Sequence, residues 1–117
     1  MEDCFVEKRI ASTRTDVDRY LREYEMLSGI VRSSRTFART YGEQSKFDEA
    51  TLTAKMYKIR SVILSVEDGR ERMLLYHYYI KGYNMERCAR LFGMSIRNAY
   101  RLKKSALESV AEKIEKE

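Results

Sequence analysis

Four basic side chains and no acidic one lie between Ser95 and Leu107, near the C-terminal end of the chain. They are Arg97, Arg101, Lys103 and Lys104. A guanidinium group can donate two hydrogen bonds to the O6 and N7 acceptors of guanine, and both Arg and Lys bind phosphate oxygens. This combination of residue types predicts the binding of a polyanion.

A helix is the element that would place these side chains on one side. Ala99, Leu102, Ala106 and Val110 recur at spacings of three and four, which predicts a buried helical face. The outward face then carries Ile96, Arg97, Asn98, Tyr100, Arg101, Lys103 and Lys104. The stretch from Ser95 to Leu107 spans about 20 Å at 1.5 Å per residue. Such a helix fits the major groove of B-form DNA, which is about 12 Å wide.

A shorter helix precedes this one. Asn84 is a candidate N-cap for a helix from about Met85 to Phe92, Gly93 supplies the turn, and Ser95 can cap the second helix. Ala89 is small where two crossing helices must approach closely. A short helix, a glycine turn and a longer helix predict a helix-turn-helix unit, and the simpler alternative is a helical hairpin with a solvated basic face.

The helix-turn-helix interpretation gives each candidate residue a role. We expect Arg97 and Arg101 to contact base edges, with Ile96 against a thymine methyl group and Tyr100 beside it. We expect Ser95, Asn98 and Lys104 to contact phosphates of the DNA backbone, together with Arg87 and Arg90 of the preceding helix.

Charge is unevenly distributed along the 117 residues. Residues 1–68 contain 12 basic and 12 acidic side chains, whereas residues 69–117 contain 11 basic and 6 acidic ones, so the net charge of +5 lies in the second half. A basic segment beside a neutral one favours contact with nucleic acid. Chance asymmetry is the alternative in a chain of this length.

The rest of the chain also predicts helix. It has no proline and only five glycines, and no alternating β-branched run predicts a strand. Apolar residues at spacings of three and four predict helices over residues 15–32, 48–66 and 69–83. We expect an all-α fold, with an N-terminal helical hairpin over residues 1–68 for dimerisation or partner binding and a helix-turn-helix domain over residues 69–117.

Two segments are less regular. Residues 33–47 predict a linker anchored by Phe37, Tyr41 and Phe47, and the alternative is a second nucleic-acid contact, since basic residues alternate with aromatic ones there. Gly29 is expected to weaken the end of the first helix. In the third helix, the apolar pattern predicts mostly buried side chains at Met73, Leu74, His77, Tyr78 and Ile80.

No catalytic or metal-binding constellation is recognisable in the sequence. His77 is the single histidine, and Cys4 and Cys88 lack the paired spacing of zinc ligands. No glycine-rich phosphate loop occurs. We expect neither an enzyme nor a cofactor. With no long apolar run and no signal-peptide pattern at the start of the sequence, a cytoplasmic protein without membrane contact is expected.

Residues 70–111 resemble region 4 of sigma-70-family factors. In that family a helix ends in an aromatic residue, a glycine precedes the helix-turn-helix, an acid opens its first helix, and Ser or Thr caps the recognition helix. The matching residues here are Tyr79, Gly82, Glu86 and Ser95, and Ala106-Leu107 match the end of the pattern. The resemblance implies a sigma-70 region 4-like helix-turn-helix that binds duplex DNA.

The layout of the whole chain, with a helical hairpin before such a unit, resembles the phage ArpU/RinA-type late transcriptional regulators. This resemblance implies control of late or packaging genes of phages and prophages. Two departures matter. Arg87 replaces the second acid of the sigma pattern, and Ile96 and Arg97 stand where sigma factors carry base-facing Arg and Glu, so a sigma-like promoter specificity is not expected.

Double-stranded DNA is therefore the expected partner of a sequence-specific transcriptional regulator. RNA polymerase and a second copy of the chain are further candidate partners. One alternative function is a protein-interaction module that engages RNA polymerase as an antagonist or co-factor. Another is a phage DNA-packaging component.

Overall fold

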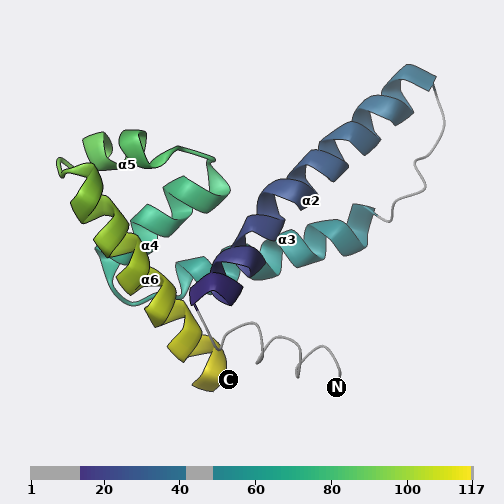
Figure 1. Cartoon of the computed structure of the whole chain (residues 1–117). Coiled ribbons are helices and arrows are strands. Elements are labelled where there is room, and N and C mark those ends of the chain that lie inside the picture. The colour runs from purple at the N-terminus through teal and green to yellow at the C-terminus, as the bar shows by residue number, and fades with distance from the viewer. Residues whose placement is uncertain (1–13, 42–48, 117) are drawn as a thin grey trace.

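The computed structural model describes residues 14–41 and 49–116, and within these residues the chain is all-α. The elements in chain order are α2 (Arg14–Tyr41), α3 (Glu49–Leu64), α4 (Gly69–Leu75), a π-helical segment η1 (Tyr76–Ile80), α5 (Met85–Leu91) and α6 (Ile96–Lys116). Figure 1 shows α2 and α3 running in opposite directions as an arm, whose far end projects from a body built by the other elements.

The first helix is longer than the sequence pattern predicted. α2 continues to Tyr41, so the predicted linker is wrong for residues 33–41. Gly29 lies inside the helix and not near its end. The hydroxyl of Thr36 donates to the carbonyl oxygen of Arg32 at 3.0 Å, and Ser34 is buried. Residues that favour turns in isolation are held in the helix because tertiary packing overrides weak local propensity. Phe47 and Asp48 lie outside the described residues.

One buried cluster joins the arm to the body. From α2 and α3 it contains Val17, Leu21, Leu27, Ile59 and Ile63, and from the later segments Val66, Leu75, Tyr79, Ala106, Leu107 and Val110. Burying one such aliphatic side chain contributes about 1.5–3 kcal/mol. The two predicted halves of the chain therefore share a continuous core, which sets the position of α6 relative to α2.

The helix α4 begins at a side-chain cap and leads directly into η1. Oδ1 of Asp68 accepts hydrogen bonds from the backbone N–H groups of Arg70 at 2.9 Å and Glu71 at 3.1 Å. At the other end, the N–H of Lys81 donates to the carbonyl oxygen of Tyr76 at 3.1 Å, five residues back. Gly82 follows with a φ of +75°, in the left-handed region that glycine adopts easily.

The buried side of this segment differs from the predicted one. Met73, expected inside, is exposed, whereas Leu75 and Tyr79 are buried together with Leu74 and the carboxylate of Glu71. Glu71 accepts hydrogen bonds from the hydroxyls of Ser105 at 2.5 Å and Ser109 at 2.6 Å, both on α6. Because its carboxylate is paired in this way, Glu71 can be buried. Apolar periodicity alone would place the Glu71 side of α4 in solvent.

Candidate nucleic-acid interface

The connection between α5 and α6 is built from side-chain caps and one glycine. Oδ1 of Asn84 accepts from the N–H of Arg87 at 2.8 Å, and Oγ of Ser95 accepts from the N–H of Asn98 at 3.1 Å. Gly93 has a φ of +64°. The two caps and the glycine turn predicted from the sequence are confirmed, and each satisfies backbone groups that a helix end leaves unpaired.

Small side chains let the two helices approach each other. Met85, Ala89 and Ala99 form a buried cluster against which Met94 packs, and Cys88 is fully buried nearby. The N–H of Met94 donates to the carbonyl oxygen of Ala89 at 2.9 Å and closes the turn. This packing fixes the direction in which the first turns of α6 present their outer side.

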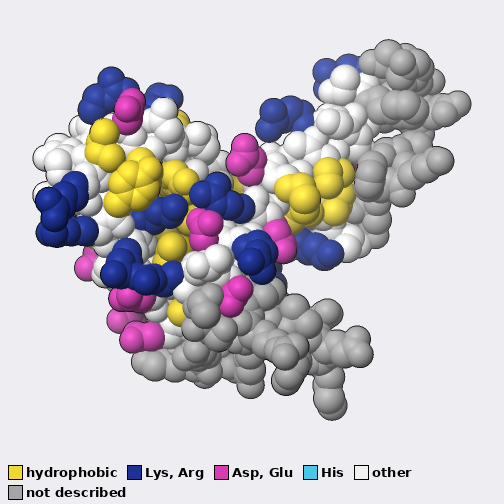
Figure 2. Space-filling view, in the orientation of Figure 1, with side chains coloured by type: hydrophobic (Ala, Val, Ile, Leu, Met, Phe, Trp, Pro, Cys, Tyr) yellow, Lys and Arg dark blue, Asp and Glu magenta, His cyan; other side chains and the backbone are white. Residues whose placement is uncertain are grey.

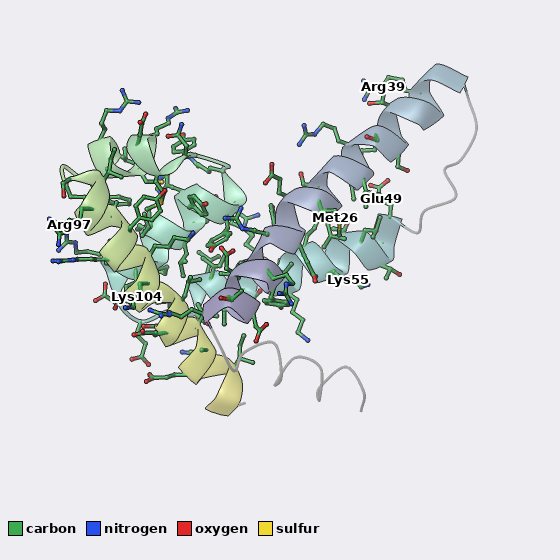
Figure 3. The ribbon with its side chains drawn as sticks, viewed as in Figure 1. Met26, Arg39, Glu49, Lys55, Arg97 and Lys104 are labelled. Carbon is green, nitrogen blue, oxygen red and sulfur yellow. The ribbon has the colours of Figure 1, made fainter. Side chains whose placement is uncertain are left out.

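All nine candidate DNA-binding residues are exposed: Arg87, Arg90, Ser95, Ile96, Arg97, Asn98, Tyr100, Arg101 and Lys104. Arg97, Arg101 and Lys104 follow one another at spacings of four and three, so they share one side of α6; we call these three residues the basic face. Figure 3 shows Arg97 and Lys104 on the part of α6 that lies away from the arm, and Figure 2 shows Lys and Arg side chains gathered at that edge of the molecule.

Lys103 does not belong to the basic face, although the sequence pattern placed it on the outward side. Its side chain is only 14% exposed, and its Nζ lies 3.6 Å from Oδ1 of Asp18. The same Nζ lies 4.5 Å from the centre of the Tyr78 ring. Lys103 occupies the side of α6 that packs on α2, where the carboxylate and the aromatic ring compensate the loss of water around its charge.

The basic face ends one turn beyond Lys104. Glu108 falls on the same side of the helix, and its Oε1 lies 3.4 Å from Nη1 of Arg14 at the start of α2. An acidic side chain at this position marks the limit of the surface that can approach a polyanion. The first turn of α6 holds no acid.

Tyr83 is a residue near this surface that the sequence pattern assigned only to a helix end. The guanidinium carbon of Arg87 lies 3.8 Å from the centre of the Tyr83 ring. Such cation–π stacking restricts an arginine side chain that would otherwise move freely in solvent. The spacing of four residues between Tyr83 and Arg87, across the start of α5, is the sequence signal that could have indicated this contact.

A charged network holds the inner side of α6 and η1 against α2. The pKa of Asp18 is lowered: burial alone would raise it, but hydrogen bonds from Tyr79 and Arg22 and the charge of Lys103 outweigh that effect. The pKa of Tyr79 is raised, first by burial and then by its hydrogen bond to Asp18. At neutral pH the carboxylate is therefore charged, and the phenol keeps its proton.

His77 and Cys88, the described residues considered for catalysis or metal binding, are held by contacts within the fold. Nδ1 of His77 lies 2.7 Å from the carbonyl oxygen of Met73, and the His77 ring contacts the rings of Tyr76, Tyr83 and Phe92. Burial raises the pKa of the Cys88 thiol. Within residues 14–41 and 49–116, no three His, Cys, Asp or Glu side chains are grouped so that they could hold a metal ion.

None of the described helices combines the length and the apolar content that a membrane-spanning segment needs. Comparison with known proteins gives no match to the chain, whether to a family model, to a curated protein or to a solved structure.

Proposed function

We propose that the protein is a sequence-specific DNA-binding regulator of phage or prophage late genes and that α6 enters the major groove. The observation that carries this proposal is the division of α6 into two sides. Ala99 and Ala106 are fully buried on one side, whereas Arg97, Arg101 and Lys104 are exposed on the other. A helix anchored on one side and basic on the other can approach a duplex without rearranging the fold.

The dimensions of the basic face suit this role. Arg97 and Lys104 are seven residues apart, which is about 10 Å along a helix, and this length is comparable to a major groove about 12 Å wide. Arg97 and Arg101 are proposed to bind guanine edges, and Lys104 is proposed to bind a phosphate. Ser95, Ile96, Asn98 and Tyr100 complete the proposed contact surface.

Phosphate contacts from α5 would set the orientation of the protein on the duplex. Arg87 and Arg90 are exposed on the helix that precedes the recognition helix, and the stacking of Arg87 on Tyr83 limits the conformations that its guanidinium can adopt. An arginine that is ordered before binding loses less conformational freedom on contact with a phosphate.

Two linked experiments test the proposal. Bound fragments are first selected from a random duplex library, and fluorescence anisotropy then measures the affinity for the selected sequence. The full chain should bind with an affinity that falls steeply with salt, because each neutralised phosphate releases about one counterion. Arg97→Ala and Arg101→Ala should each weaken the selected site by about 1–3 kcal/mol, and Lys104→Ala should weaken all duplexes alike.

The alternative module that engages RNA polymerase or another protein gives a different result in the same assay. Such a module should bind duplex DNA weakly at every salt concentration, and selection should enrich no sequence. That outcome would exclude the proposed function and leave the basic face as a surface for an acidic protein partner.

A further inference from the structure

Beyond Arg22, one side of α2 carries no charged residue over the two turns from Met26 to Ser33. Met26, Gly29, Ile30 and Ser33 follow one another on α2 at spacings of three, one and three, so they share one side of the helix; we call these four residues the arm face. Met26 is 58% exposed, Ser33 is exposed, and Gly29 and Ile30 are half-buried. Figure 2 shows an apolar patch on the arm in the region where Figure 3 labels Met26. In a chain in which 35% of the residues are charged, an uncharged face with these spacings is typical of helix–helix packing.

No contact within the described residues requires a glycine at position 29. It lies in the middle of the 28-residue helix α2, and a Cβ atom added there would meet nothing within 4 Å. Glycine in a helix interior costs about 0.5–1 kcal/mol relative to alanine. A second helix that approaches the backbone closely at this position would account for a residue that the isolated fold does not need.

We propose that the arm face binds the arm face of a second copy of this chain, with the two α2 helices antiparallel. A two-fold axis midway between Gly29 and Ile30 places each Met26 opposite Ser33 of the second copy. Gly29 and Ile30 lie on opposite edges of the arm face, because neighbouring residues are about 100° apart around a helix. An antiparallel two-fold axis pairs like edges, so it brings the two Gly29 residues together on one edge and the two Ile30 side chains together on the other. The paired glycines let the helix backbones approach closely, and the contact is isologous.

The charges beside the arm face agree with the antiparallel arrangement. Glu25 and Arg32 flank the arm face on the same edge of α2, and both are exposed. The antiparallel two-fold axis brings Glu25 of each copy beside Arg32 of the other, which gives two equivalent ion pairs. Within the described residues Glu25 forms no ion pair, and the guanidinium of Arg32 lies 3.5 Å from the hydroxyl of Ser28. A parallel pairing would separate the two charges by seven residues, about 10 Å along the helix.

The expected strength of association follows from the size of the contact. Two helical turns from each copy form an interface in the small class, below about 1,200 Å² in total, and such interfaces are generally transient. We expect dissociation at low micromolar concentration and association at higher concentration. This inference does not depend on the proposed DNA binding, because the arm face and the basic face are on different helices.

Analytical ultracentrifugation of the full chain over a range from about 1 µM to about 1 mM tests the proposal. The wild-type protein should shift from 13.9 kDa toward twice that mass. Gly29→Leu and Met26→Asp should keep the chain monomeric and still folded by circular dichroism. Met73→Asp is the matched control, because Met73 is also exposed, at 42%, but lies on α4; this variant should associate like the wild type.

Exchange of the flanking charges tests the antiparallel arrangement. Glu25→Arg and Arg32→Glu should each weaken association at least tenfold, and the double variant should recover most of the loss. A wild-type chain that stays monomeric throughout the range would overturn the proposal, as would association that is unchanged in Gly29→Leu and Met26→Asp. A double variant that stays as weak as the two single variants would overturn the antiparallel pairing.

Discussion

The hydroxyl of Tyr79 donates a hydrogen bond to Oδ1 of Asp18, and this bond joins the π-helical segment η1 to α2. Lys103 of α6 lies 3.6 Å from the same oxygen atom, and Arg22 donates to Oδ2 of Asp18 at 2.8 Å. One carboxylate on α2 thus contacts both η1 and α6. The inner side of α6 is fixed by this network, and its outer side keeps the basic face exposed.

Asp18→Asn should lower the free energy of unfolding by about 1–3 kcal/mol, because hydrogen bonds to a charged acceptor contribute more than those to a neutral one. Urea denaturation followed by circular dichroism at pH 7 measures the change. Glu108→Gln is the matched control, since it removes only an exposed ion pair with Arg14, a type of pair worth about 0–1 kcal/mol. Equal effects of the two substitutions would show that the Asp18 network contributes no more than a surface contact.

The stabilisation by Asp18 should depend on pH. The pKa of Asp18 in the folded chain lies below its ordinary value of 3.8, so its contribution is present above that value and is lost as pH falls through the lower folded value. The difference in unfolding free energy between wild type and Asp18→Asn should therefore be largest near pH 7 and shrink below about pH 4. A difference that stays constant from pH 7 to pH 2.5 would contradict the lowered pKa.

Two glycines offer a matched pair of substitutions that differ in backbone conformation. A Cβ atom meets nothing within 4 Å at either Gly93 or Gly29, but Gly93 has a φ of +64° whereas Gly29 lies within α2. Gly93→Ala should destabilise the fold by about 1–2 kcal/mol, the cost of a side chain in the left-handed region. At concentrations where the chain is monomeric, Gly29→Ala should stabilise it by about 0.5–1 kcal/mol. Thermal unfolding of both variants gives the sign of each change in stability, and a stabilising Gly93→Ala would contradict the turn geometry.

The sequence was most informative where structure is determined locally. Asn84, Gly93 and Ser95 were predicted as caps and turn from residue type and spacing alone, and each has that geometry. A cap is made by atoms only a few residues apart, so its signal survives in a short window of sequence. Ala89 was likewise predicted at the crossing of the two helices and Ala99 on the buried face of the second helix, and both are buried.

Features that depend on distant partners could not be predicted in this way. Lys103 looks like a solvent-facing base until Asp18 and Tyr78, from two other elements, are placed beside it. Glu71 is buried only because Ser105 and Ser109 reach its carboxylate from α6. The spacing of apolar residues along the chain does not reveal such pairs between distant residues. For the same reason it did not predict the extension of α2 past Ser33.

Reversing the charges of the basic face tests whether this surface of α6 binds duplex DNA. Arg97→Glu with Lys104→Glu changes two charges on that face. Arg39→Glu with Lys55→Glu makes the same change in net charge on the arm, at two exposed residues that lie far from α6 in Figure 3. Anisotropy with the selected duplex, at one salt concentration, compares the two double variants with the wild type. We predict that the α6 variant loses at least a hundredfold in affinity while the arm variant loses less than about tenfold through long-range charge alone. Equal losses in both variants, or unchanged binding by the α6 variant, would contradict the assignment of α6 as the recognition helix.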